Sequence, residues 1–438
     1  MKSKGFRRYL SNTSWLLFSK IYRMGLALLL TVLMARYLGP EDFGLLSYAL
    51  SLVTLFSVLI TLGLESLVVK EVLSCPEEQE KTIASSIALR SLGCVIFIIS
   101  VTVVVLMLSP GETTTIGLVA IISTGYLFKV FEVIRYWFEA HVQAKYSAGM
   151  ELIAFTFSII LKVVMIILNA PLIYFSIAVA SEFVIMSLGL LYLYLSNSNV
   201  DINKLRPDSN RIIYLLNNAW PLILSTALYI IFSKIDQIML GEIIGNTAVG
   251  IYAVSVKVSE GASFVPTMIA TSLYPMILNA RKKSRDLYIE RTQDLLNLMV
   301  FVGVVIAIAV GLIANPLINI AFGEQYHESV NILIVHIWGG VVIALSSVSY
   351  RYLIAEGLQK YAFYRSLLGV VANVLLNLWL IPWQGAMGAA IATVVSQIIA
   401  LYLFNMTTKN TRELFLLQTK ALFFTTTLRT VKSLRSLK

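Results

Sequence analysis

The stretch that decides the fold runs from Ser233 to Gly261 and reads SKIDQIMLGEIIGNTAVGIYAVSVKVSEG. In its middle, two glycines flank the short segment NTAV, and a long apolar run lies on each side. Helices commonly end at glycine, so this pattern predicts a tight turn between two long helices. The same stretch places charged side chains in otherwise apolar surroundings, among them Lys234, Asp236, Lys257 and Glu260.

The same pattern occurs in the first part of the chain. Gly39 and Gly44 flank PEDF there, as Gly245 and Gly250 flank NTAV. In both places an apolar run ends, a short glycine-bounded turn follows, and another apolar run begins. Two matched glycines are a weak signal alone, but the matched runs around them indicate an internal duplication.

Composition assigns the chain to the membrane. Of its 438 residues, 58% are hydrophobic and 13% are charged, whereas soluble domains are roughly half apolar and about a quarter charged. The alternating hydrophobicity of transmembrane strands is absent, which argues against an outer-membrane barrel. Neither Cys75 nor Cys94 suggests a disulfide or a metal site.

The apolar runs predict an all-α integral membrane protein with twelve transmembrane helices, each of about 20 residues. The predicted spans are 14–35, 43–64, 84–108, 115–137, 148–168, 172–195, 213–235, 247–271, 293–314, 329–350, 361–381 and 385–405. A polar break divides six spans from six. The predicted organisation is an N-terminal bundle (1–196), a cytoplasmic linker (197–212), a C-terminal bundle (213–406) and a basic cytoplasmic tail (407–438).

The positions of Lys and Arg predict the orientation. With the N-terminus inside, the inner segments hold most of the basic residues, and Arg36 stands alone in the outer turns. Both termini are therefore expected in the cytoplasm. The net charge of +10 then faces the membrane surface, so nucleic acid is not an expected partner. Because each half starts and ends inside, the halves are expected to be parallel repeats with a cavity between them.

The tail leaves two interpretations open. Residues 414–424 are mostly apolar with one lysine, and further basic residues follow. A basic helix lying on anionic headgroups is one interpretation, and a solvated, frayed terminus is the other.

The chain carries no motif of an enzyme. No phosphate-binding G-x-x-x-x-G-K-[ST] loop is present, and the three histidines have no metal-ligand spacing. His336, inside a span, is expected to be a hydrogen-bonded packing residue. No outer loop is long enough for a catalytic domain, so we expect a non-enzyme without a cofactor or metal.

Charged residues inside the spans are the candidate functional residues. Each costs about 2.5–3.5 kcal/mol at mid-membrane on insertion scales, so it usually faces a cavity or a partner. Lys20 and Arg23 are three residues apart and share a helical face. Snorkelling to the headgroups is the alternative for Lys20, whereas the deeper Arg23 is expected in the cavity.

Two further spans carry charged faces. Lys129, Glu132, Arg135 and Glu139 fall on one stripe, which predicts either an ion-pair ladder or a functional surface. Lys257 and Glu260 also share a face, whereas Lys234 and Asp236 point to nearly opposite sides.

Other residues inside the spans predict a buried ion pair and two bends. From their depths in neighbouring spans, Lys162 and Glu182 are expected to form the ion pair. Pro221 and Pro266 are expected to bend the seventh and eighth spans.

Four segments resemble the polysaccharide-biosynthesis (Wzx-type) flippase family of the multidrug/oligosaccharidyl-lipid/polysaccharide exporter superfamily. They are LMARYLGPEDFGLLSYALS (33–51), ITLGLESLVVKEV (60–72), NNAWPLILSTALYIIFSKIDQIMLG (217–241) and TSLYPMILNARKK (271–283). The resemblance runs to about residue 406.

The resemblance implies two six-helix bundles in a MATE-like V and export of undecaprenyl-diphosphate-linked oligosaccharide, such as an O-antigen unit of lipopolysaccharide, across the bacterial inner membrane. It also implies a cationic cavity and coupling to an H⁺ or Na⁺ gradient. A polysaccharide polymerase and a chain-length regulator are implied as partners. The positions expected to line the cavity are Lys20, Arg23, Arg135, Lys257 and Arg351. Those expected in ion coupling or gating are Asp236, Glu132 and Lys234.

Three alternatives remain. A multidrug cation antiporter of the same superfamily would need an anionic cavity. A polysaccharide polymerase or ligase would need a sizeable outer loop. A peptidoglycan-precursor flippase is a near relative with about two additional spans expected.

Overall fold

The computed structural model describes residues 2–197 and 204–423, and every element in these ranges is a helix. The α-helices are α1 (Lys2–Phe56), α2 (Val58–Thr61), α3 (Glu65–Ser74), α4 (Gln79–Leu108), α5 (Thr113–Leu127), α6 (Val133–Ala140), α7 (Ala144–Ile167), α8 (Leu172–Asn197), α9 (Ser209–Ile243), α10 (Asn246–Lys283), α11 (Arg285–Ala321), α12 (Ser329–His336), α13 (Gly339–Ala355), α14 (Gln359–Leu401) and α15 (Arg412–Leu422). Short 3₁₀ turns are η1 (Pro76–Glu78), η2 (Phe128–Glu132), η4 (Glu324–Tyr326) and η5 (Leu403–Met406).

The all-α membrane fold predicted from the sequence is confirmed, but with ten continuous candidate spans in the described residues instead of twelve. Phe18–Ser74 takes in residues 18–35 of the first predicted span and the whole of the second, and Gln359–Met406 contains the last two. Each of these long segments bends at a non-helical glycine: Gly39 in α1 and Gly385 in α14. The difference in number therefore arises where two predicted spans continue through a bent glycine.

The glycines matched in the two halves also match in conformation. Gly39 has φ 74° and ψ 173°, and Gly245 has φ 119° and ψ 176°. A side chain would be strained at either positive φ, which explains the glycine at both turns. The predicted proline positions are also found inside helices, with Pro221 in α9 and Pro266 in α10.

The contacts divide the chain into two compact units, Met1–Lys234 and Ile235–Lys438. The division falls inside α9. The predicted linker, 197–212, includes residues 198–203, which lie outside the described residues. The domain boundary at that linker stays a prediction.

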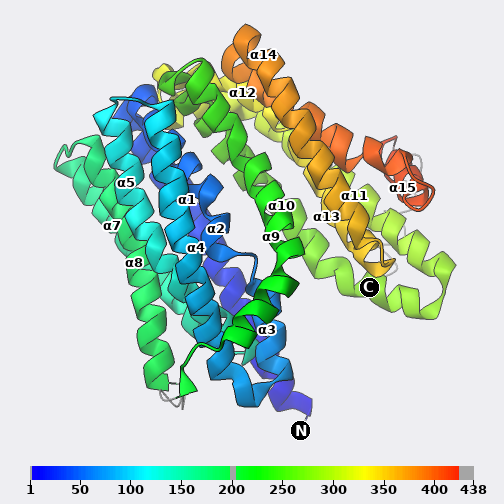
Figure 1. The fold of residues 1–438 in the computed structure, drawn as a ribbon. Helices are drawn as coiled ribbons and strands as arrows, with labels where there is room; N and C mark the ends of the chain where they lie inside the picture. Colours follow the sequence, from blue (N-terminus) through cyan, green and yellow to red (C-terminus); the bar gives the residue numbers. More distant parts are fainter. Residues whose placement is uncertain (1, 198–203, 424–438) are drawn as a thin grey trace. The chain divides into compact units, whose positions relative to one another are not determined.

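Unit 1 is a bundle in which α7 packs against α1 and α8, and α5 packs against α8 and α1 (Figure 1). The beginning of α9 belongs to this bundle, since Leu215 and Ala219 lie in its buried core. A polar cluster reinforces that attachment. Arg211 Nη2 donates to a carboxylate oxygen of Glu71 on α3 at 2.8 Å and to the Thr82 hydroxyl on α4 at 3.0 Å.

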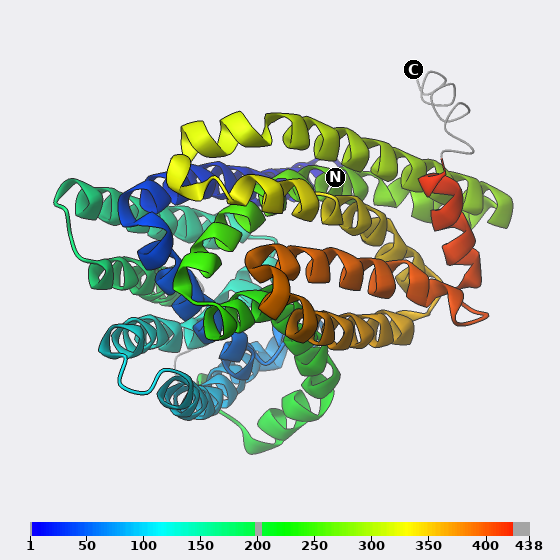
Figure 2. The same ribbon diagram turned by 90° about the horizontal axis from the view of Figure 1, so that it is seen from above.

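Unit 2 is built from α10, α11, α13 and α14, with α10 packed along α11 (Figure 2). Helix α15 packs on α11 and α13 through buried Leu414, Leu417 and Ala421. Arg285 at the start of α11 pairs with Glu413 of α15. The described part of the tail is therefore a helix attached to unit 2, and residues 424–438 lie outside the described part.

Many large apolar side chains point outward from both units. Leu29, Ile99 and Met107 in unit 1, and Leu312 and Trp383 in unit 2, are all more than half exposed. In a helical chain of this hydropathy, such side chains face lipid, where they cost no hydrophobic energy.

Candidate functional site

Arg23 of α1 and Arg135 of α6 are brought together by one carboxylate, Glu151 of α7. Arg23 Nη1 lies 3.3 Å from Glu151 Oε2, and Arg135 Nη1 lies 2.9 Å from Glu151 Oε1. Glu151 is therefore a bridge that holds each guanidinium by a different oxygen. The two arginines are 112 residues apart in sequence (135 minus 23), and both are among the residues predicted to bind the substrate.

Two further carboxylates complete this cluster. Arg23 Nη2 lies 3.6 Å from Glu182 Oε1 of α8, and Arg135 Nε donates to Glu139 Oε1 at 2.8 Å. The five side chains form what we call the arginine–glutamate cluster: Arg23, Arg135, Glu139, Glu151 and Glu182.

The arginine–glutamate cluster is not cationic by itself, contrary to the basic lining expected from the arginines alone. Two guanidinium groups meet three carboxylates in it. The Arg23 side chain is 38% exposed, whereas that of Glu151 is only 12% exposed. Both arginine side chains are therefore more exposed than the carboxylate that bridges them.

The other predicted residues of unit 1 lie apart from this bridge. Lys20, on the same helix as Arg23, is exposed. Glu132 lies 3.9 Å from Arg90 Nη2 and takes no part in the bridge. Arg90 is fully buried and donates its Nε–H to the carbonyl of Ile60 at 3.0 Å, at the break that follows α2. Glu132 thus neutralises a structural arginine.

The predicted close ion pair between Lys162 and Glu182 is not formed, although Glu182 is the charged group that acts electrostatically on the buried Lys162. Glu182 pairs with Arg23, and no carboxylate of the described residues lies within the 4.0 Å ion-pair limit of Lys162, which is nevertheless buried. The depth estimate was consistent with a pair, but depth along a helix does not fix the direction in which a side chain points.

In unit 2, Asp236 is the centre of a buried polar cluster and is only 5% exposed. Its Oδ2 accepts hydrogen bonds from the Tyr252 hydroxyl at 2.8 Å and the Thr393 hydroxyl at 2.5 Å. Its Oδ1 accepts one from Asn377 Nδ2 at 2.6 Å. Side chains from α9, α10 and α14 therefore meet at one carboxylate. We call this group the Asp236 cluster; its members are Asp236, Tyr252, Asn373, Asn377 and Thr393.

The Asp236 cluster is rich in oxygen and lacks a counter-charge. Within the described residues, no Lys, Arg or His lies within ion-pair distance of Asp236. The side-chain oxygen of Asn377 is buried and has no hydrogen-bond partner, while that of Asn373 accepts a bond from Asn377 Nδ2 at 3.3 Å. A buried carboxylate without a counter-charge is costly, and the three hydrogen bonds that Asp236 accepts offset part of that cost.

The other predicted residues of unit 2 have separate contacts. Lys257 Nζ lies 3.5 Å from Glu260, with both side chains about half exposed. Arg351 donates to the Thr271 hydroxyl at 2.7 Å and lies over the Tyr274 ring at 5.6 Å. None of these contacts involves Asp236.

Lys234 and His336 are the remaining sequence candidates. Lys234 is the last residue of unit 1 and is half-buried. His336 is buried, with Nδ1 3.0 Å from the Ser259 hydroxyl and its ring edge-on to Tyr252. The expectation of a hydrogen-bonded packing histidine is confirmed.

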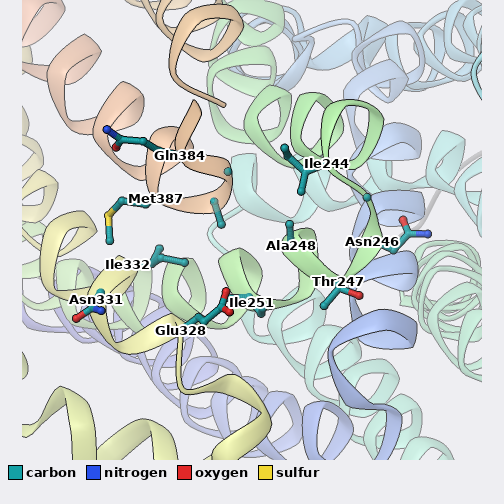
Figure 3. Close-up of a pocket in the computed structure, with 13 residues that line it drawn as sticks. Ile244, Asn246, Thr247, Ala248, Ile251, Glu328, Asn331, Ile332, Gln384 and Met387 are labelled. Atoms are coloured by element: carbon teal, nitrogen blue, oxygen red, sulfur yellow. The ribbon is translucent and has the colours of Figure 1, made fainter. Parts of the chain in front are cut away.

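A pocket opens in unit 2 between the α9–α10 turn, the start of α12 and the bend in α14 (Figure 3). Its polar lining comes from Asn246, Thr247, Glu328, Asn331 and Gln384. None of the residues predicted to bind substrate or ion lines it.

Sequence reasoning overlooked Arg90 and Glu151. Both are charges inside predicted apolar spans, so the rule that identified Arg23 could have found them. Asn377 and Thr393 carried no comparable signal, because neutral polar residues are common in transmembrane helices. In the part of the chain that the structure describes, no group of three or more His, Cys, Asp or Glu could hold a metal.

Together, the ten apolar helical segments of the described residues and the charged clusters on them define a multi-pass membrane protein of the transporter type. The family model described as "Polysaccharide biosynthesis protein" matches residues 9–281, and that of "Lipid II flippase MurJ" matches residues 206–435. The chain belongs to the polysaccharide-biosynthesis (Wzx-type) flippase family of the multidrug/oligosaccharidyl-lipid/polysaccharide exporter superfamily.

Individual relatives and solved structures agree with this family. The chain is 24% identical over 383 residues to the capsular polysaccharide biosynthesis protein CapF of Staphylococcus aureus, covering 85% of this chain and 92% of that protein. Its fold is similar to that of the lipid II flippase MurJ in an inward closed conformation, with a TM-score of 0.72 and 15% identity over 93% of this chain and 90% of that one. An inward-facing multidrug resistance MATE family transporter gives a TM-score of 0.66 and 13% identity, over 92% and 96% of the two chains.

Proposed function

We propose that the protein translocates undecaprenyl-diphosphate-linked oligosaccharide units across the bacterial inner membrane, as a step in making an O-antigen, capsule or exopolysaccharide. The observation that carries this proposal is the near-full-length similarity to a capsular polysaccharide biosynthesis protein within a flippase family. Both termini are proposed to lie in the cytoplasm, following the distribution of Lys and Arg.

The arginine–glutamate cluster supports recognition of a diphosphate. A guanidinium group presents two parallel N–H donors that match phosphate oxygens. Arg23 and Arg135 share the bridging Glu151 and are each about one-third exposed, so both donors face one place. We assign the diphosphate to these two residues, with Lys20 adding charge from the same face of α1. In unit 2, Lys257 and Arg351 are the proposed counterparts.

The Asp236 cluster supports coupling to an ion gradient. Hard cations such as Na⁺ prefer oxygen ligands. Tyr252, Thr393 and Asn377 contact this carboxylate, and the side-chain oxygen of Asn377 is buried without a hydrogen-bond partner. Na⁺ or H⁺ binding at Asp236 would supply the missing positive charge and favour one state of alternating access over the other. Glu132 and Lys234 are assigned supporting roles in gating.

A second candidate function is a multidrug cation antiporter. The three carboxylates of the arginine–glutamate cluster favour it, since cationic drugs need anionic partners. The two functions make opposite predictions for Arg23 and Arg135, which a diphosphate needs and a cationic drug does not. A polymerase or ligase is disfavoured by the match to a flippase family model.

The proposal is tested in the parent bacterium by surface polysaccharide. Arg23→Ala and Lys257→Ala should each reduce surface polysaccharide while the amount of inserted protein stays constant, because each removes a positive charge facing the substrate. Arg23→Lys and Lys257→Arg should be milder. Lys360→Ala, an exposed cation beside Tyr361 outside the proposed site, is the matched control. Normal export by both alanine variants contradicts the proposed phosphate contacts. Loss of resistance to cationic dyes with normal polysaccharide, in a strain that lacks the protein, favours the antiporter.

A further inference from the structure

The bridging carboxylate Glu151 occupies the guanidinium edges that a diphosphate would use. Its two oxygens bind different arginines, at 3.3 Å from Arg23 and 2.9 Å from Arg135. The hydroxyl of Ser19 lies 3.5 Å from the same Oε2 that faces Arg23. Glu151, on α7, is therefore held in place from two other helices, α1 and α6.

We propose that Glu151 competes with the substrate's phosphate groups for binding to Arg23 and Arg135. Its carboxylate must leave the two arginines when the diphosphate binds, and it returns when the substrate is released. This inference rests on the proposed function and adds to it the residue that limits how tightly the diphosphate is held. A carboxylate and a phosphate are alternative anionic partners for the same N–H fork, so they cannot both be fully bound.

The charges of the arginine–glutamate cluster support competition. With Glu139, Glu151 and Glu182 ionised, two positive charges meet three negative charges. An added diphosphate would be repelled unless one carboxylate moves away from the arginines. Glu151 is the carboxylate that contacts both arginines, so its displacement frees the most binding capacity at once.

The accessibilities indicate how the exchange would occur. The Arg23 and Arg135 side chains are 38% and 33% exposed, whereas Glu151 is 12% exposed. A ligand approaching from outside the bundle therefore meets the arginines first. Arg23 also stacks over the Phe155 ring at 5.2 Å, which keeps its guanidinium in position without Glu151.

Competition has a functional consequence. A transporter must release its substrate, and two uncontested arginines would hold a diphosphate too long. An anion that rebinds the arginines lowers the affinity and speeds release. A neutral polyprenol cannot displace Glu151, so the same contact also selects for a charged head group.

The test measures binding of undecaprenyl diphosphate and of undecaprenol to the full chain in lipid nanodiscs. Glu151→Gln keeps the shape of the side chain but removes its charge. It should bind undecaprenyl diphosphate about tenfold more tightly than the wild type, from the loss of one charge-assisted competitor. Undecaprenol binding should not change, and export in cells should fall because release slows.

Two further variants keep the test decisive. Glu182→Gln removes a carboxylate that contacts Arg23 and not Arg135, so its affinity for undecaprenyl diphosphate should rise less, about threefold. This variant replaces Glu151→Gln in the test if Glu151→Gln does not fold. Glu356→Gln is the matched control. Glu356 lies 3.6 Å from Arg281 and 2.8 Å from Arg285 in unit 2, so it also bridges two arginines, but outside the proposed site. Its removal should leave both affinities unchanged.

The outcomes separate this inference from the proposed function. Unchanged or weaker diphosphate binding by Glu151→Gln and Glu182→Gln, with wild-type binding that still depends on Arg23, overturns the competition alone. A wild type that binds undecaprenyl diphosphate no better than undecaprenol overturns the proposed function as well.

Discussion

Replacing Asp236 with asparagine should leave the fold intact and remove the response to the coupling ion. The geometry makes this substitution unusually mild. The asparagine oxygen can stay at the Oδ1 position and accept from Asn377, which now donates at 2.6 Å. Its amide then takes the Oδ2 position and donates to the Tyr252 and Thr393 hydroxyls, which can rotate to accept. No polar group is orphaned, so the free energy of unfolding should change by less than about 1 kcal/mol.

The response to Na⁺ should change far more. At about 100 times its dissociation constant, a ligand that binds only the folded state stabilises it by about 2.7 kcal/mol. For a unit of about 150–250 residues, 1 kcal/mol corresponds to roughly 2–4 °C in Tm. The wild type should therefore gain about 5–11 °C on saturation with Na⁺, and the asparagine variant should gain nothing.

The assay is thermal unfolding in detergent, with NaCl exchanged for choline chloride at constant ionic strength. Asp236→Ala is the informative companion, since it leaves the donors around the carboxylate poorly paired and should lose about 1–3 kcal/mol. A wild-type Tm that rises on acidification but ignores Na⁺ identifies H⁺ as the ion. An Asp236→Asn variant that keeps the full wild-type ion response refutes the assignment of this cluster.

Three further predictions concern packing and buried charge. Arg211→Gln and Glu71→Gln should each lower the free energy of unfolding by about 3–5 kcal/mol, because each leaves a buried charged partner unpaired. The double variant should lose less than the sum of the two losses, which melting curves of all three variants can check. Gly93→Ala should lower the free energy of unfolding by about 1–3 kcal/mol through overpacking, because the added Cβ would lie 2.0 Å from a backbone carbonyl oxygen in α2. Gly25→Ala, whose added Cβ would have no atom within 4 Å, is the control in the same melting assay. Lys162→Met should raise Tm or leave it unchanged, since this buried lysine has no ion pair in the described ranges, and a fall of several degrees would reveal a polar role.

Much of the fold follows from the sequence because hydropathy in a membrane protein is a strong physical constraint. Every backbone group must be satisfied inside the helix, so apolar runs of the right length become helices. The count of continuous segments was harder to predict. Gly39 and Gly385 bend the chain without ending the helical segment, and a hydropathy pattern cannot distinguish a bend from a turn.

The candidate sites were predictable by residue type but not by pairing. Arg23, Arg135 and Asp236 stood out as charges in apolar runs, and the structure places each in a polar cluster. The sequence predicts Lys162 as the partner of Glu182, whereas the structure pairs Glu182 with Arg23. Both basic residues lie at compatible depths on different helices. Which of them a glutamate meets depends on the rotation of each helix in the bundle, and the sequence alone does not fix that rotation.

The most direct test of the account is translocation of a fluorescent undecaprenyl-diphosphate-linked saccharide in proteoliposomes, read by quenching of the lipid in the outer leaflet. The wild type should move the lipid between leaflets, and should do so faster with an imposed Na⁺ or H⁺ gradient. Arg23→Ala combined with Arg135→Ala should abolish that movement, while a cationic dye should not be transported by either protein. Translocation that is unaffected by loss of both arginines, or a wild type that moves the dye and leaves the lipid in place, would contradict the account.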